Sequence, residues 1–91
     1  MKDFIVRNLQ SYNNNPVPNQ FEIITPAGVY FQSYDKIIVH RVNGNTFLDE
    51  LYWDYSRTTL KYLHIFLGLS TKEIKDRIKC GIYKFKNLND E

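Results

Sequence analysis

The chain contains little cysteine and little glycine, and each shortage excludes a class of protein. Among its 91 residues there is a single cysteine, Cys80, so no internal disulfide can support the fold. A small domain without disulfides is typical of a reducing cytoplasm, and a lone cysteine near a helix end is expected to be buried as a small apolar side chain. The four glycines all fall at predicted turns or helix ends, which leaves none for a phosphate-binding loop. We therefore expect a cytoplasmic domain without a cofactor.

Long apolar runs are also missing from the chain. The longest nearly apolar segment, residues 63–69, is far shorter than a membrane-spanning helix. The apolar run near the N-terminus, Phe4 to Val6, is too short for a signal peptide. The sequence therefore predicts a soluble protein with no membrane partner.

The residue types that most often carry catalysis or bind metals form no recognisable pattern here. His40, His64 and Cys80 are isolated from one another and match no zinc spacing. No serine lies in a nucleophile elbow, and most carboxylates fall at predicted turns or helix caps. A chain of 91 residues forms one modest core and has no room for a separate cofactor domain. We therefore predict no catalytic residues, no metal site and no enzyme activity.

Apolar, aromatic and β-branched residues are abundant over residues 21–50, where they predict an antiparallel meander of about four strands. Turn residues separate the expected strands, which cover residues 21–25, 29–34, 37–42 and 45–48. Asn43-Gly44 is the strongest turn signal, because both residues tolerate the positive φ angles of a type I′ turn. This part of the chain is therefore expected to form a sheet.

The N-terminal segment carries mixed signals. Over residues 1–12 apolar residues recur at helical spacing, whereas Ile5 and Val6 are β-branched and favour a strand, so both structures remain open. Residues 13–20 contain two prolines and no periodicity, which predicts a loop.

Two helices are expected after the meander. Ser56, or alternatively Asp54, is a suitable N-cap for a helix over residues 57–67. Gly68 is a suitable residue to end that helix. A second helix follows at once, because the segment beginning at Ser70 has the sequence of a capping box.

The remaining residues complete an α+β domain. Residues 82–86 alternate in polarity and predict a C-terminal strand. The predicted fold is a meander followed by two helices packed on one of its faces and a final strand. The expected parts of the single domain, residues 1–91, are an N-terminal segment and loop (1–20), the meander (21–50), the helical pair (51–81) and the final strand (82–88).

The densest group of aromatic residues lies where the meander meets the first helix. It contains the only tryptophan of the chain, and Tyr, Trp and Arg are the residue types that dominate protein interfaces. The same group could instead be a structural corner, with Trp53 capping the core and Arg57 paired with Asp54. The candidate protein-binding residues of this group are Tyr52, Trp53, Tyr55, Arg57 and Thr58.

The first predicted helix has apolar residues on two sides. Its core stripe is expected to comprise Thr59, Leu60, Leu63, His64, Phe66 and Leu67. Tyr62 and Ile65 fall on the opposite side, where an exposed apolar patch would bind a partner protein or a second copy. Alternatively, the N-terminal segment covers them through Phe4, Ile5 and Leu9.

Charge is distributed unevenly along the chain. Residues 1–55 carry four basic and six acidic residues, whereas residues 56–91 carry eight basic and four acidic residues. A basic surface interleaved with tyrosines could contact the phosphates and bases of a nucleic acid, although a solvated helix face is the alternative. The candidate nucleic-acid-binding residues are Lys61, Lys72, Lys75, Lys79, Lys84 and Lys86.

Several segments resemble a small uncharacterised protein family that occurs in phages and mobile elements of Gram-positive bacteria. They include Tyr30 to Ile38, with its Phe-Gln-Ser-Tyr motif, and Tyr52 to Thr59, with the sequence Tyr-Trp-Asp-Tyr-Ser-Arg-Thr-Thr. The resemblance extends over roughly residues 20–89. It implies no known activity, but it does imply a phage or mobile-element setting, in which small accessory proteins usually bind a macromolecule in the host cytoplasm.

The sequence therefore supports three functional hypotheses. The first is a non-enzymatic accessory protein that binds a protein, with inhibition of a host or defence factor as one role. The alternative is a nucleic-acid-binding accessory protein that uses the basic C-terminal half. The third is a homo-oligomer in which the helices at residues 57–67 pack together.

Overall fold

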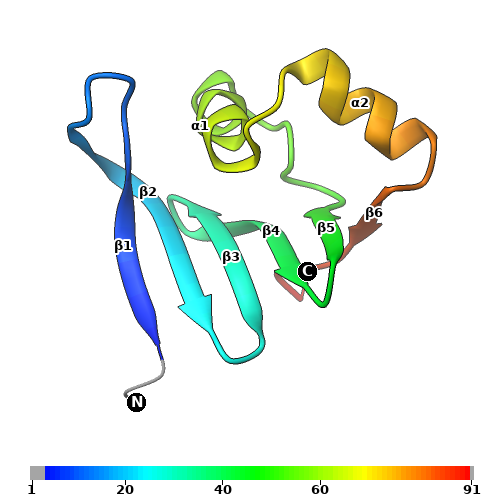
Figure 1. Ribbon diagram of the computed structural model, residues 1–91, viewed down its shortest axis with the longest axis horizontal. Helices are drawn as coiled ribbons and strands as arrows, with labels where there is room; N and C mark the ends of the chain where they lie inside the picture. The colour runs from blue at the N-terminus through cyan, green and yellow to red at the C-terminus, as the bar shows by residue number, and fades with distance from the viewer. Residues whose placement is uncertain (1–3, 91) are drawn as a thin grey trace.

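The computed structural model describes residues 4–90, which form a six-stranded sheet and two helices (Figure 1). The elements are β1 (Ile5–Gln10), β2 (Pro16–Thr25), β3 (Gly28–Ser33), β4 (Lys36–Val42), β5 (Asn45–Asp49), α1 (Arg57–Leu67), α2 (Thr71–Lys79) and β6 (Tyr83–Lys86). The strands lie in the sheet in the order of the sequence. The predicted α+β class is therefore confirmed, although six strands replace the expected meander of about four and a final strand.

The first five strands are antiparallel, but β6 runs parallel to β5. The helical pair accounts for this change, because a parallel neighbour requires a crossover that returns the chain to the same end of the sheet. β6 is also shorter than the predicted strand over residues 82–88.

The N-terminal segment forms the edge of the sheet. Residues 5–10 adopt the strand alternative rather than the helical one, and they pair with β2. The loop predicted over residues 13–20 is wrong from residue 16 onward, because β2 already begins at Pro16. This first part of β2 pairs with β1 alone, and pairing with β3 starts only at Gln20. Prolines are tolerated there because their missing N–H groups lie where the strand has one neighbour.

Local turn and cap signals are confirmed. Asn43 and Gly44 have φ angles of 52° and 79°, as the hairpin signal predicts. Ser56 caps α1 by accepting a hydrogen bond from the Thr59 N–H, and Gly68 follows the last turn of that helix with a positive φ. Both reciprocal hydrogen bonds of the capping box are present at the start of α2.

The capping box makes a testable contribution to stability. We expect Ser70→Ala to lower the free energy of unfolding by about 1 kcal/mol, measured by urea denaturation. The Ser70 N–H donates a hydrogen bond to the Glu73 carboxylate, and this bond lowers the pKa of Glu73. The contribution of that carboxylate is therefore present at neutral pH and is lost as the pH falls through its lowered pKa. Lys75→Ala on the same helix is the control and should have little effect; equal losses would contradict the prediction.

The core lies between one face of the sheet and the helices. Phe31 of β3 stacks on Phe66 of α1 with ring centroids 5.5 Å apart, and the Ser33 hydroxyl lies 2.9 Å from the Thr59 hydroxyl. At the other end, the Arg77 guanidinium of α2 lies 5.8 Å from the centroid of the Tyr83 ring. The buried hydrophobic residues are Leu9, Phe31, Ile38, Val39, Leu48, Tyr62, Leu63 and Ile74.

Candidate functional site

The aromatic group at the join of sheet and helices is divided between the core and the surface. Tyr52 and Trp53 are half-buried and pack against the core, and the Trp53 ring lies 6.1 Å from that of Phe85. The other three candidates, Tyr55, Arg57 and Thr58, are exposed. The structural interpretation therefore applies to the first two residues, and a contact role for the exposed three stays a prediction.

Asp49, which lies outside this group, fixes the start of the connection between β5 and α1 through hydrogen bonds. The Asp49 carboxylate is only 1% exposed and accepts hydrogen bonds from the N–H groups of Leu51 and Tyr52, at 3.1 and 2.9 Å. Its other oxygen accepts a 2.8 Å hydrogen bond from the Leu88 N–H. Asp54, which the sequence suggested as a cap, is exposed. The partner at Leu88 is distant in sequence, so no local pattern identifies this role.

The exposed patch predicted on the first helix does not form. Tyr62 is only 7% exposed and belongs to the core together with Leu9 of β1, while Ile65 is half-buried against the same core. The N-terminal segment thus reaches this side of α1 through Leu9, although Phe4 and Ile5 remain 54% and 52% exposed.

Cys80 is exposed as well, contrary to prediction, because it lies at the C-cap of α2, beyond the residues that the helix buries.

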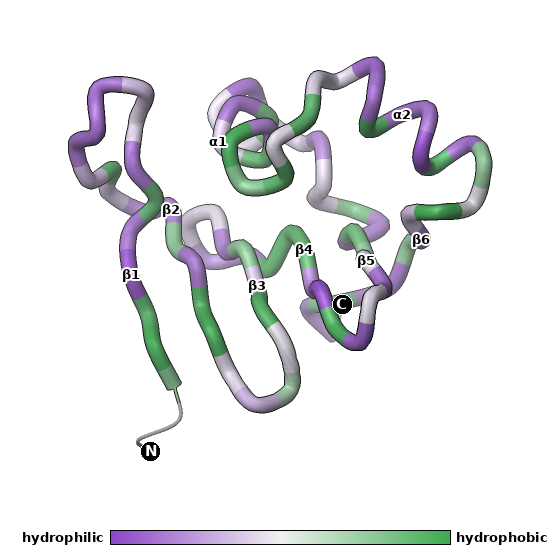
Figure 2. Tube along the Cα trace, viewed as in Figure 1, coloured by the Kyte–Doolittle hydropathy of each residue, from purple (hydrophilic) through white to green (hydrophobic). Residues whose placement is uncertain are grey.

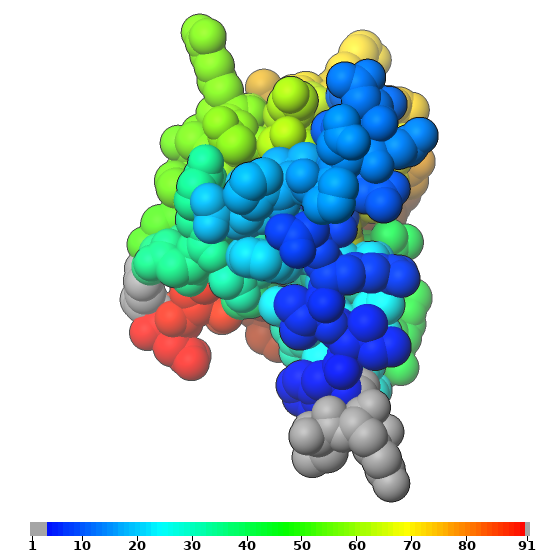
Figure 3. Space-filling view, turned by 90° about the vertical axis from the view of Figure 1, so that its left-hand side faces the viewer, coloured from blue at the N-terminus to red at the C-terminus, as the bar shows by residue number. Residues whose placement is uncertain are grey.

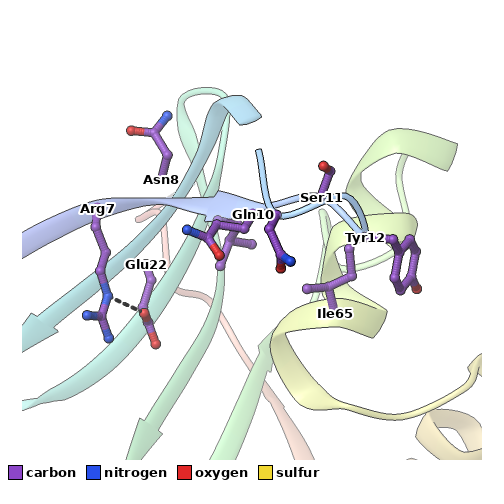
Figure 4. A pocket seen from close by; sticks show the side chains of 9 residues that line it. Arg7, Asn8, Gln10, Ser11, Tyr12, Glu22 and Ile65 are labelled. Carbon is purple, nitrogen blue, oxygen red and sulfur yellow. Dashed lines mark hydrogen bonds and ion pairs between the residues drawn. The ribbon is translucent and has the colours of Figure 1, made fainter. Parts of the chain in front are cut away.

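A polar cleft separates the β1–β2 connection from α1 (Figure 4). It has a volume of about 540 Å³ and extends from Arg7 to Tyr12 along the chain, with Ile65 on the α1 side. Its two oppositely charged side chains, Arg7 and Glu22, bind each other at 2.8 Å. Among residues 4–90 no group of three or more His, Cys, Asp or Glu side chains could hold a metal ion.

The six candidate lysines do not form one surface. Lys72, Lys75 and Lys79 are exposed on α2, which packs on the helix side of the sheet. Lys84 and Lys86 are exposed on β6, where the register places Lys84 beside Phe47 on the opposite side. The remaining lysine, on α1, is exposed with its amino group over the Tyr62 ring. Positive charge is therefore divided between two layers of the molecule.

The sheet face that lies away from the helices carries a row of side chains that are apolar or aromatic apart from a lysine at one end. Strand pairing aligns one residue from each strand, in the order Val6, Ile23, Tyr30, His40, Phe47 and Lys84. Side chains on neighbouring strands that pair directly point to the same face. Phe31, Val39 and Leu48, which point to the other face, are all 0% exposed beneath the helices. We refer to the row as the open-face row.

Further apolar residues widen this face. Phe21 pairs with Gln32, and Gln32 pairs with Ile37, so these residues form a second row beside the first. A shallow apolar depression of about 310 Å³ also lies on this face, lined by Phe4, Ile23, Thr25, Ala27, Tyr30 and Ile37. Figure 2 shows apolar stretches of β1, β2 and β3 that lie away from both helices. A sheet that buries one face normally carries polar residues on the other, so an apolar second face indicates a contact surface.

Two neighbouring rings of the open-face row, those of Tyr30 and His40, are in contact. Tyr30 and His40 are stacked with centroids 4.1 Å apart and planes only 5° from parallel. The His40 Nε2 lies 2.9 Å from the Ala27 carbonyl oxygen, which orients the imidazole. At the β6 end, the Lys86 amino group lies 5.2 Å from the centroid of the Phe47 ring. The face therefore has an apolar centre and a basic margin.

A signal for this face was present in the sequence. Each of Ile23-Ile24, Ile37-Ile38 and Phe47-Leu48 places two apolar residues in succession, so both faces of their strands are apolar. Such pairs occur in strands that are covered on both sides. The prediction that both helices pack on one face of the sheet leaves the other face of these strands without a helix.

A comparison with known families matches residues 4–81 to a family of unknown function, DUF8033. The chain belongs to this family. The match covers β1 to α2 and therefore includes five of the six strands that form the open-face row. No curated protein and no solved structure gave a match to this DUF8033 chain. Within its described residues, neither helix has the length and apolar character needed to cross a membrane.

Proposed function

We propose that this DUF8033 protein is a non-enzymatic binding module that takes a partner protein on the open face of its sheet. The observation that supports the proposal is the open-face row, which crosses all six strands opposite the helical layer. Apolar surface of this kind is stabilised when a partner removes it from water. The rigid sheet holds the side chains in place before binding, which limits the entropy lost on association.

The distribution of apolar and charged side chains on the open face indicates what kind of surface the partner protein has. Its centre requires an apolar surface, and Lys84 and Lys86 at one margin favour a partner with acidic groups at the corresponding edge. A nucleic acid fits less well. The rings of Tyr30 and His40 stack on each other, so their facing sides are not free to stack on a base. The other candidate lysines, Lys61, Lys72, Lys75 and Lys79, lie on the helices instead. We therefore favour a protein with an apolar patch and an acidic rim.

The biological setting of the proposal comes from the family resemblance. A phage or mobile-element accessory protein in the host cytoplasm would meet host proteins at high concentration. Binding through a preformed apolar face could block a surface that a host or defence protein needs. Inhibition of such a protein is the role that we assign to the module.

Site-specific photo-cross-linking tests which surface makes the contact. Benzoylphenylalanine is placed at Phe47 on the open face, at Tyr55 in the exposed aromatic group, or at Leu51, which is 56% exposed elsewhere. In a lysate of the source organism we expect discrete protein adducts from position 47 alone, resistant to nuclease. Equal adducts from positions 47 and 51, adducts from position 55 alone, nuclease-sensitive adducts or no adducts would each overturn the proposal.

Once the partner is identified, affinities provide a quantitative prediction. We expect Tyr30→Ala to weaken binding about 30-fold, as for a central aromatic contact, while Leu51→Ala changes it less than about twofold. The double variant Lys84→Glu, Lys86→Glu should weaken binding and change its salt dependence, whereas Lys72→Glu, Lys75→Glu on α2 should not. Calorimetric titration measures the affinities, and circular dichroism checks that each variant folds. Equal losses for the two lysine pairs would contradict an acidic rim opposite β6.

A further inference from the structure

We propose that the β1 edge of the sheet pairs with β1 of a second copy of this chain, joining two six-stranded sheets into one. The paired groups would be backbone N–H and C=O groups of β1, which among the strands of residues 4–90 has a single neighbour, β2. The inference does not depend on the proposed function, because it concerns the backbone groups of an edge strand, although Val6 of that strand also belongs to the open-face row.

The two edges of the sheet are protected to very different degrees. β6 has four residues, two of which are lysines, and short charged edge strands resist pairing with another chain. β1 has six residues and contains neither lysine nor proline. Its only charged side chain, Arg7, is turned onto its own sheet, where its Nε binds Glu22 at 2.8 Å. The β1 edge therefore lacks the usual features that prevent strand addition.

Exposed apolar residues flank this unprotected edge on both faces of the sheet. Phe4, Ile5 and Val6 are 54%, 52% and 60% exposed. Figure 1 shows that the helices do not extend over this end of β1, and Figure 3 shows β1 in dark blue on the surface of the molecule. A second sheet can therefore approach without displacing a described element.

A two-fold axis perpendicular to the sheet makes the edge self-complementary. Antiparallel pairing about this axis keeps both helical layers on one side and both open faces on the other. With Val6 opposite Val6 of the second copy, Ile5 lies opposite Arg7, and Phe4 lies opposite Asn8. Moving the axis to Arg7 would place two guanidinium groups opposite each other, which is unfavourable. We therefore assign the axis to Val6.

Sedimentation velocity over a concentration series tests self-association of the full chain. We expect a reversible dimer, and Ile5→Lys should raise the dissociation constant about tenfold or more, because it introduces charge at the paired edge. Ile82→Lys is the control, since Ile82 is 57% exposed and lies outside β1, and it should leave the dissociation constant unchanged. A monomer at every concentration, or equal effects of the two variants, would overturn the proposal.

Two further measurements locate the contact. Hydrogen exchange of the β1 amides should slow as protein concentration rises, while β6 amides stay unchanged. In a Cys80→Ser background, Val6→Cys should form a disulfide-linked dimer on oxidation faster than Arg7→Cys, because only the former lies at the proposed axis. Unchanged exchange in β1, or faster cross-linking at position 7, would contradict the arrangement. Loss of the dimer in Phe47→Lys but not in Ile5→Lys would place the contact on the open face instead.

Discussion

Replacement of Asp49 by alanine is expected to lower the free energy of unfolding by about 3 kcal/mol. The Asp49 carboxylate accepts hydrogen bonds from three backbone N–H groups, two at the start of the connection to α1 and one at Leu88. The carboxylate itself is 1% exposed, so its removal leaves these donors without their partner in a region that water reaches poorly. Urea denaturation followed by tryptophan fluorescence measures the loss, since Trp53 lies within this connection.

Two companion variants separate the hydrogen bonds from other effects. Asp49→Asn preserves the shape of the side chain but has one acceptor oxygen in place of two, so we expect an intermediate loss. Glu50→Ala removes an exposed neighbouring carboxylate and should change stability by less than about 0.5 kcal/mol. A loss below about 1 kcal/mol in Asp49→Ala would mean that the loop and the C-terminal segment are held by other contacts.

Substitution of Gly28 by alanine is expected to cost about 3 kcal/mol. Gly28 has a φ of 124°, a conformation that side chains with a Cβ rarely adopt. A Cβ at this position would lie 2.4 Å from the Arg41 carbonyl oxygen, so the backbone of β3 or β4 must move to accept it. Thermal unfolding followed by circular dichroism provides the measurement.

The matched control for this substitution is Gly44→Ala. Gly44 also has a positive φ, of 79°, but no atom of residues 4–90 is found within 4 Å of its added Cβ. Only the local backbone cost of about 1 kcal/mol is then expected. If the two variants lost the same stability, the close approach to β4 would contribute nothing, and only the backbone conformation would matter.

The first helix illustrates why burial was harder to predict than secondary structure. Its boundaries follow from Ser56 and Gly68, whose effects on the helix ends are local. The helical wheel, however, placed Tyr62 opposite the core stripe and left open whether the N-terminal segment covers it. In the structure the sheet and Leu9 of the N-terminal hairpin both contribute to the core around this helix, so Tyr62 is buried. A helical wheel gives the direction of each side chain but not how many other elements pack against the helix.

The candidate site was predictable only in part. The sequence pointed to Tyr55 and Arg57, which are indeed exposed, and to Lys84 and Lys86, which lie at the margin of the open face. It did not identify Tyr30, because strand residues become a surface only when strand order, register and the position of the helices are known. The open-face row depends on five successive strand pairings, and an error of one residue in any of them would turn side chains to the other face.

The sequence by itself determined the hairpin at Asn43-Gly44, the boundaries of α1, the start of α2 and the α+β class. These features depend on backbone conformations and hydrogen bonds that connect residues within about one turn of each other. Only the tertiary structure decided that β6 runs parallel to β5, that Asp49 binds the Leu88 N–H and that one apolar face lies opposite the helices. Those features join residues far apart in the chain, and their geometry follows from the packing of the whole sheet.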